Sequence, residues 1–400
     1  MRKKIVTVFA PQANLKRSLR AHFRKLGLQH ESEGKLAPKS NEKDALRAMH
    51  AHQRETKLEA HRDFIRDRAE LLQKVMAIGS EIEPHRIELR LQRIDKGTRE
   101  SDLFRLASLT WSAPVSNGFG RRLRYLVWDS YHQKLAGLIA LGDPVFNLSV
   151  RDDLIGWSST DRSERLVNVL DAYVLGSLPP YNSLLLGKVI ACLVRTKEIY
   201  NDFLEAYGSR NGVISGENKQ ARLLLVTTSS SLGRSSVYNR LKLGEVHFFK
   251  SIGYTQGWGH FHISDEIFAR LRTFLESIDH PYVKQNRFGQ GPNWRLRTIR
   301  AGLKELGLSE SALHHGIRRE VFTCELAENA ISILRTGRGR PKVSTLLNVP
   351  EVCAAGIQRW VIPRAASRPE FKLWTPATLI DELRGQRTTI SQPVSLTNAN

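Results

Sequence analysis

The sequence predicts a mixed α/β fold, and three observations lead to it. Between about residue 120 and residue 230, short apolar runs alternate with helical patterns, which is the order of an α/β core. Helix-forming residues without proline or glycine, 41–76, precede that core, and further helical patterns follow it. With 41% hydrophobic residues among 400, the chain has ample apolar side chains for a buried core.

The N-terminal region, residues 1–100, is predicted to be basic and helical. Residues 1–30 hold eight Lys or Arg and no Asp or Glu, a pattern typical of a nucleic-acid contact and also of a solvated helix face. Residues 41–76 are expected to form one long helix that packs on a neighbour through its C-terminal half. A shorter helix is expected over 83–95, with Pro84 in its first turn.

The predicted core, residues 101–265, begins with a helix that ends near Trp111. After it we expect two strands joined by a turn, a helix leading into a strand, a helix closed by a glycine, a buried apolar strand and two strand-like pieces. These segments are 121–130, 135–143, 160–178, 180–208, 221–229, 246–254 and 259–264.

The C-terminal part is predicted to be helical over 266–335 and extended over 336–400. Helical patterns cover 265–278, 294–307 and 311–335. From Thr336 onward proline and arginine dominate, so we expect a basic arm laid over a surface and a disordered tail.

The charge of the chain points to a polyanionic partner. Lys and Arg number 61 against 40 Asp and Glu, a formal charge of +21, and a field of that sign favours nucleic acid. Three scattered cysteines form neither a disulfide framework nor a zinc site. The longest apolar stretch, 184–194, is interrupted by Lys188 and is about half a membrane span. We therefore expect a cytoplasmic protein without a membrane contact.

Three basic segments are candidates for binding nucleic acid. The serine loop, residues 229–241, offers serines, glycine and arginines before a predicted helix, a pattern of phosphate cradles and equally of a well-capped helix. A second set lies along the helix predicted to begin near Asn293, and a third resembles an AT-hook, although Gly337 also suits a helix end and a structural joint. The candidates are Arg234, Ser235, Ser236, Arg240, Arg295, Arg297, Arg300, Arg338, Arg340 and Lys342.

Two weaker candidates concern catalysis. Asp152, in "RDDLIGW", could hold Mg²⁺ for a metal-dependent nuclease or strand-transfer reaction, or could simply cap a turn and pair with arginine. His260 and His262 stand two apart, so on a strand they would share one face as an acid–base pair or two metal ligands. Two histidines on a half-exposed strand are the alternative. No cofactor is expected, apart from Mg²⁺ if the nuclease hypothesis holds.

The segment 171–194 is similar to the coenzyme-A-binding segment of GNAT acetyltransferases. In those enzymes a glycine-rich loop at a helix N-terminus binds pyrophosphate. If Gly187 is the last glycine of that loop, Leu185 replaces the middle one and Asn182 the leading Arg or Gln. The similarity implies a GNAT-like core with a degraded cofactor loop, and acyl transfer as the weakest alternative function.

Four stretches together resemble the DruA family of the Druantia anti-phage defence system, with related domains in transposase-like proteins. They are residues 125–157, which include the R-D-x-x-I-G-W motif, then 229–241, 252–264 and 293–322. The resemblance covers roughly residues 100–375. It implies a defence subunit that works with other Druantia proteins, including a large helicase-like subunit. With the charge, it predicts binding to DNA, either phage DNA or its replication intermediates.

Overall fold

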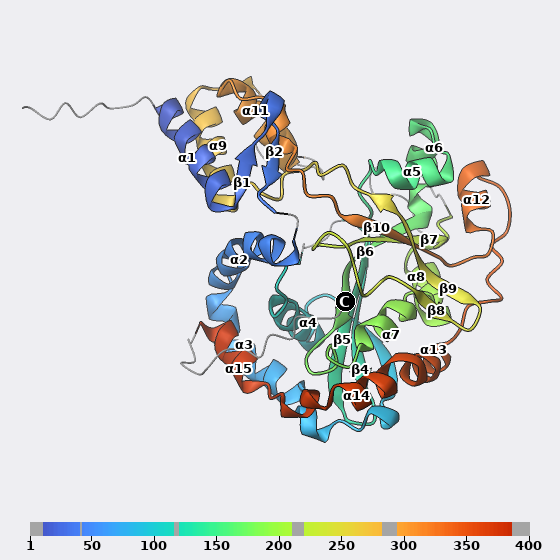
Figure 1. Cartoon of the computed structure of the whole chain (residues 1–400). Coiled ribbons are helices and arrows are strands. Elements are labelled where there is room, and N and C mark those ends of the chain that lie inside the picture. The colour runs from blue at the N-terminus through green and yellow to red at the C-terminus, as the bar shows by residue number, and fades with distance from the viewer. Residues whose placement is uncertain (1–10, 41, 116–119, 210–219, 282–293, 386–400) are drawn as a thin grey trace, which may run out of the picture.

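An eight-stranded sheet forms the centre of the computed structural model, which describes residues 11–40, 42–115, 120–209, 220–281 and 294–385 (Figure 1). The strand order is β3-β4-β5-β6-β7-β10-β9-β8, and β6 with β7 is a parallel pair while the other pairs are antiparallel. The mixed α/β fold is therefore confirmed. The strands are β3 (Leu89–Arg93), β4 (Arg122–Asp129), β5 (Lys134–Gly142), β6 (Val169–Ser177), β7 (Leu225–Ser229), β8 (Leu241–Leu243), β9 (Val246–Tyr254) and β10 (Glu320–Glu325).

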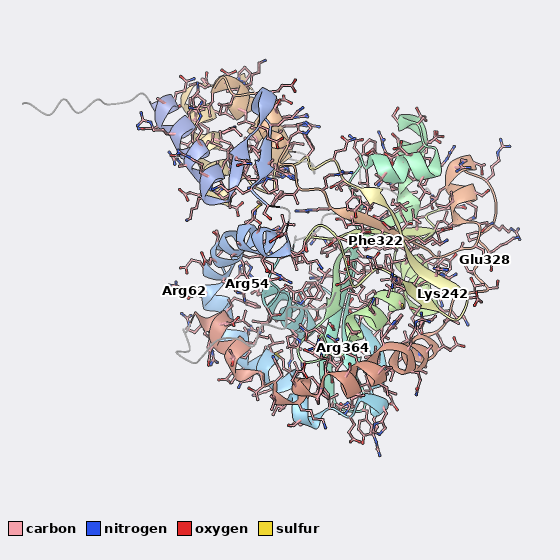
Figure 2. All side chains as sticks on the ribbon, viewed as in Figure 1. Arg54, Arg62, Lys242, Phe322, Glu328 and Arg364 are labelled. Atoms are coloured by element: carbon pink, nitrogen blue, oxygen red, sulfur yellow. The ribbon has the colours of Figure 1, made fainter. Side chains whose placement is uncertain are left out.

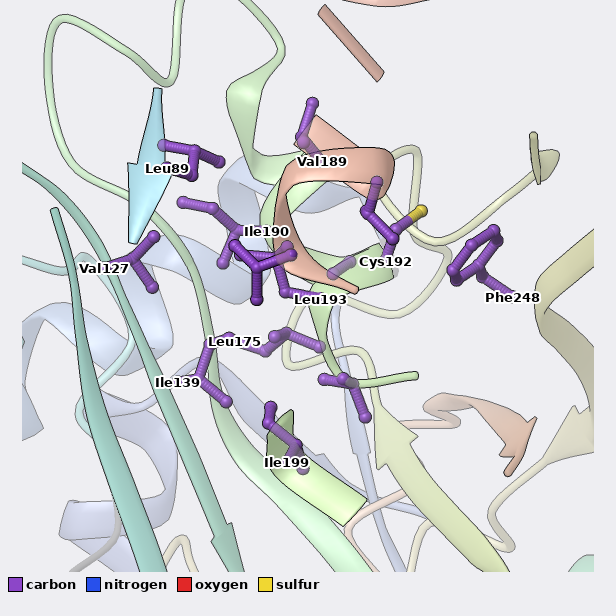
Figure 3. Close-up of a cluster of buried hydrophobic side chains, with 14 of the residues drawn as sticks. Leu89, Val127, Ile139, Leu175, Val189, Ile190, Cys192, Leu193, Ile199 and Phe248 are labelled. Atoms are coloured by element: carbon purple, nitrogen blue, oxygen red, sulfur yellow. The ribbon is translucent and has the colours of Figure 1, made fainter. Parts of the chain in front are cut away.

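Both faces of the β3–β6 half of the sheet are covered by helices. Alternate residues of β4 serve opposite faces: Tyr125 and Val127 pack in the cluster of α7 (Leu186–Leu193), α8 (Lys197–Tyr207) and α13 (Val349–Gly356), part of which Figure 3 shows. Leu126 packs in the cluster of α3 (Arg62–Val75), α4 (Arg99–Leu109) and α15 (Ala377–Arg384). Each fully buried aliphatic side chain contributes about 1.5–3 kcal/mol, so this two-sided burial stabilises the sheet strongly.

The apolar stretch that includes Lys188 became α7. Every residue of α7 except Lys188 is buried, because the helix packs between β6 and α13. Within the described parts of the chain, no helix has both the length and the apolar character that a bilayer crossing requires.

A second hydrophobic cluster lies outside the sheet and forms the lobe at the upper left of Figure 1. It joins α1 (Pro11–Lys25) and the β1–β2 hairpin (Leu28–His30 and Leu36–Pro38) to α9 (Asp265–Ser277) and α11 (Trp294–Glu305). The regions expected separately, 1–100 and 266–335, thus contribute side chains to one core. A contact between segments so distant in sequence leaves no local pattern.

The helix predicted over 41–76 is two helices, α2 (Lys43–Glu59) and α3, with a break at Ala60 and His61. The reason is that the apolar side chains of the two helices pack in different hydrophobic clusters. Leu46 of α2 packs in the lobe, whereas Leu72 of α3 packs under the sheet, as expected for the C-terminal half. One straight helix cannot place both side chains.

Two helices predicted from composition are strands in part. Within 83–95 the chain forms β3, whose Leu89 and Leu91 follow the two-residue period of a strand. Within 311–335 it forms β10, which lies between β7 and β9, and only then α12 (Ala330–Thr336). The β-branched and aromatic run at 321–323 fits a buried strand better than a helix, and the sheet decides between them.

The described part of the segment expected to be an extended arm, 336–385, is largely helical, and the tail predicted to be disordered lies outside the described residues. The described part forms α13, a π-helical turn (Ile357–Val361), α14 (Ile362–Ser367) and α15. Pro350 and Pro363 lie in the first turns of α13 and α14, where the missing N–H of proline costs nothing. The prolines therefore begin helices here, and the expectation of an extended chain was wrong.

Candidate nucleic-acid interface

A cavity of about 1170 Å³ opens where α7, the serine loop and the π-helical turn meet. Its walls come from α7 and the residues before it, from the start of α2, from the end of α4 and from residues 359–364. Among the described residues that line it, six are basic and none is acidic. The basic ones are Lys43, Lys188, Arg234, Arg240, Arg359 and Arg364.

The serine loop is the first wall, and it holds four of the residues predicted to bind nucleic acid. Arg234, Ser235, Ser236 and Arg240 all line the cavity. The helix expected after Ser235 is absent: residues 231–240 form turns, in which Ser235 Oγ accepts hydrogen bonds from the backbone N–H of Val237 and Tyr238, both at 3.2 Å. The serine therefore holds the loop's own shape, as serine often does in turns.

The loop before α7 is the second wall. Leu185 stands in the left-handed region, with φ of 59°, directly before the first residue of α7. A Cβ added at Gly187 would lie 3.2 Å from Ser177 Oγ, so this glycine lets α7 approach β6 closely. Two segments that sequence reasoning treated as separate phosphate sites, 182–188 and 229–241, thus line one cavity. The GNAT-like arrangement of the core stays a prediction.

Lys188 fastens these two walls together. Its Nζ donates to the backbone carbonyls of Ser236, Val237 and Asn239 at 3.0–3.2 Å. Burial lowers the pKa of Lys188, and the charges of Arg240 and Arg359 lower it further. The cavity thus gathers positive charges close enough to disfavour one another, and a bound anion would relieve that repulsion.

The third wall was missed as a site by sequence reasoning. The Nζ of Lys188 lies 5.9 Å from the centre of the Trp360 ring, and the guanidinium of Arg359 lies 5.7 Å from it. Arg364, labelled in Figure 2, donates from Nε to the Ser183 carbonyl at 3.2 Å. Trp111 also lines the cavity, against Gly176. The two arginines and the tryptophan of "RWVIPR", 359–364, were the available signal in the sequence.

Four of the six cations have side chains that form no hydrogen bond or ion pair with the described residues. Lys43, Arg234, Arg240 and Arg359 are exposed, and the guanidinium of Arg359 lies over the Trp360 ring. Their charge is therefore available to a ligand, unlike that of Lys188 and Arg364.

Of the three arginines predicted to bind nucleic acid on α11, two form ion pairs and one forms none with the described residues. Arg295 pairs with Asp265 at 2.7 Å and lies 4.4 Å from the ring centre of Phe268. Arg300 lies 3.2 Å from Glu310 and 5.3 Å from the ring centre of Trp258. Arg297 is exposed and has no ion pair with the described residues. None of the three lines the cavity.

The AT-hook-like segment is a structural joint with exposed cations. Gly337, with φ of 73°, ends α12 as predicted. Asn329 holds the backbone that follows: its amide donates to the Arg340 carbonyl at 3.0 Å, and its oxygen accepts from the Lys342 N–H at 2.9 Å. The side chains of Arg338, Arg340 and Lys342 remain exposed and form no ion pair with described residues.

Asp152 is enclosed by arginines. It lies on α5 (Ser149–Ile155), where one carboxylate oxygen accepts from Arg151 at 2.7 and 2.9 Å and the other from Arg162 at 2.8 Å. Arg151 is completely buried. Both oxygens of Asp152 therefore form ion pairs with arginines, which fits a structural role better than a metal ligand. Among the described residues, no group of three or more His, Cys, Asp or Glu could hold a metal ion.

His260 and His262 do not lie on a strand. Gly257 and Gly259 adopt positive φ and turn the chain, so the expectation of one shared strand face was wrong. His262 is buried in the lobe, where its Nε2 lies 2.9 Å from the Ala312 carbonyl and its ring packs 5.6 Å from that of His315. Ser235 lines the cavity, but Asp152, His260 and His262 do not. The candidate catalytic residues therefore do not meet the serine loop in one site.

The fold and this cavity define the class: a mixed α/β protein with a basic, tryptophan-bearing cavity at the side of its sheet. The family model described as Druantia protein DruA matches residues 40–336. A protein named Druantia protein DruA from Escherichia coli (strain UMEA 4076-1) is 54% identical over 377 residues, which cover 94% of this chain and 93% of that protein. The chain therefore belongs to the DruA family, as the resemblance predicted. No solved structure matches it significantly.

Proposed function

We propose that this Druantia protein is the nucleic-acid-binding component of an anti-phage defence system and that the cavity is its binding site. The observation that supports this most directly is the lining: six basic residues and no acidic one among those described. A carboxylate-free basic wall favours a polyanion over a protein surface of mixed charge.

Two features favour nucleic acid over a simple anion. The side chains of Arg234, Arg240 and Arg359 form no hydrogen bond or ion pair with the described residues, so each can meet a phosphate oxygen. Trp111 and Trp360 add aromatic surface in the same cavity, and aromatic rings stack on bases. We take DNA as the nucleic acid, either that of the phage or its replication intermediates. The other Druantia proteins, including a large helicase-like subunit, are the proposed partners.

The metal-dependent nuclease is the less supported alternative. Its carboxylate, Asp152, is occupied by Arg151 and Arg162, and it stands apart from the cavity. Acyl transfer gains no support either, because Leu185 places a side chain where the cofactor loop of acetyltransferases has glycine. The proposal therefore includes no reaction and no cofactor.

The test is a fluorescence-anisotropy titration with labelled DNA and RNA over a salt series. The triple variant R234Q/R240Q/R359Q removes three cavity charges, and R90Q/R99Q/R384Q removes three exposed arginines that do not line the cavity. We expect the cavity variant to lose at least about tenfold in affinity and up to about 3 units of salt slope, because each phosphate contact contributes about 0.7–0.9. Equal losses in both variants would mean that charge alone, without a site, binds DNA. Tighter binding of RNA than of DNA would overturn the choice of DNA.

A further inference from the structure

A pair of exposed aromatic residues lies at the end of β9 and in the segment that follows it, each with an arginine over its ring. Tyr254 is 37% exposed and has the guanidinium of Arg318 at 5.3 Å from its ring centre. Trp258 is 40% exposed and has the guanidinium of Arg300 at 5.3 Å. We name these four residues the aromatic track.

The aromatic track is joined to the cavity through Glu320. One carboxylate oxygen of Glu320 accepts from the backbone N–H of Ser235, a cavity residue, at 3.0 Å. The backbone of Glu320 pairs with Tyr254 across β10 and β9, and its N–H donates to the Gly233 carbonyl at 3.1 Å. The serine loop and the first residue of the track therefore lie on neighbouring backbone segments.

From Tyr254 the track continues along residues 255–258, which are held by backbone hydrogen bonds. The N–H of Thr255 donates to the Arg319 carbonyl at 2.9 Å, and Trp258 pairs with His314. Arg297, exposed and one helical turn before Arg300 on α11, adds at the far end a cation that has no ion pair with the described residues. Aromatic rings and cations thus follow one another from the edge of the cavity to the lobe.

We propose that the bound nucleic acid is single-stranded and runs from the cavity along the aromatic track, an inference that rests on the proposed function. The cavity has the size of a small-ligand pocket, so it can enclose a few nucleotides of one strand but not a duplex. In a duplex the bases are paired and stacked on one another. Only an unpaired strand presents base faces to Trp111, Trp360, Tyr254 and Trp258. Its phosphates would meet Arg318 and the cavity arginines that form no ion pair with the described residues.

The structure supplies a matched control for the track. Tyr131 and Phe146 are also exposed, 42% and 46%, and also carry an arginine over the ring: Arg86 at 5.1 Å and Arg162 at 4.6 Å. Neither residue lines the cavity or belongs to the track. The double variants Y254A/W258A and Y131A/F146A therefore remove the same kind of surface at different places.

The experiment is a titration of labelled oligothymidylate, from about 4 to about 16 nucleotides, against the full chain and both double variants, with a hairpin duplex as competitor. We expect single strands to bind at least about tenfold more tightly than the duplex, and affinity to rise with length to a plateau. Y254A/W258A should lose about tenfold or more for the longest oligonucleotides and little for the shortest, whereas Y131A/F146A should match the wild type. Circular dichroism confirms that each variant is folded.

The outcomes separate this inference from the function on which it rests. A preference for duplex, or equal losses in the two double variants, would overturn the single-strand track while leaving DNA binding in place. Affinity that does not rise with length would do the same. Absence of binding to any nucleic acid at low salt would instead remove the proposed function itself.

Discussion

Lys188 donates from its ammonium group to the backbone carbonyl of Ser236 at 3.0 Å, and so ties the first turn of α7 to the serine loop. Two further carbonyls of the loop accept from the same nitrogen. Lys188 thus holds the loop in place, and its ammonium group already donates three hydrogen bonds to the protein before a ligand binds.

Replacing Lys188 with methionine should loosen the serine loop. Hydrogen bonds to a charged group are worth about 1.5–3 kcal/mol, so we expect a loss of stability of that order and faster amide exchange over 231–240. K43M is the control, because it removes the same charge from the cavity wall without touching these carbonyls. Hydrogen-exchange mass spectrometry checks the prediction; unchanged exchange in K188M would contradict it.

Replacing Asp152 with asparagine should destabilise the fold. The substitution leaves Arg151, which is 0% exposed, without its counter-charge, and breaking a buried ion pair costs about 3–5 kcal/mol. R162Q, which removes the more exposed partner, should cost less. Urea unfolding measures both. A stable D152N protein that had lost a Mg²⁺-dependent nicking activity would instead support the nuclease alternative.

Acid should destabilise the lobe through its buried histidines. Burial lowers the pKa of His262 to about 4 and that of His315 to about 3, from the usual 6.5. Between pH 6.5 and about 4 the unfolded chain binds these protons and the folded chain does not. The free energy of unfolding therefore falls with falling pH, by about 1.4 kcal/mol per pH unit for each histidine.

The pH dependence can be assigned with one substitution. His262→Gln keeps an amide donor for the Ala312 carbonyl but removes one titrating ring. It should therefore reduce the slope over this window by about 1.4 kcal/mol per pH unit and leave the contribution of His315. H85Q, at an exposed position, should not alter the slope. Urea midpoints measured from pH 7 to pH 4 check the prediction, and an unaltered slope in H262Q would contradict it.

Replacing Arg338 and Arg340 with alanine should weaken DNA binding equally for all sequences. Asn329 forms hydrogen bonds with the backbone of Arg340 and Lys342. The segment could therefore enter a minor groove only if these hydrogen bonds broke. The exposed side chains can still contact phosphates, and we expect a loss of a few fold with a smaller salt slope. Titrations with A·T-rich and G·C-rich duplexes check this prediction. A loss of affinity confined to the A·T-rich duplex would instead support binding in the minor groove.

The elements with a strong local signal were predictable. The strand–turn–strand pattern of 121–143 became β4 and β5, and the helical period of 294–307 became α11, because each element's own residues decide its form. Where local preference was ambiguous, the sheet decided. Residues 320–325 became the strand β10 because β7 and β9 offer hydrogen bonds on both sides.

For the site, the sequence by itself determined the chemistry: a charge of +21, a serine-rich loop with arginines, and a degraded glycine loop before an apolar helix. It also placed the chain in its family. Only the tertiary structure decided that the two loops share a cavity with Arg359 and Trp360, more than a hundred residues away, and that Asp152 pairs with Arg151 and Arg162. The physical reason is that charge and side-chain type are properties of single residues, whereas a cavity and an ion pair depend on distances that only packing sets.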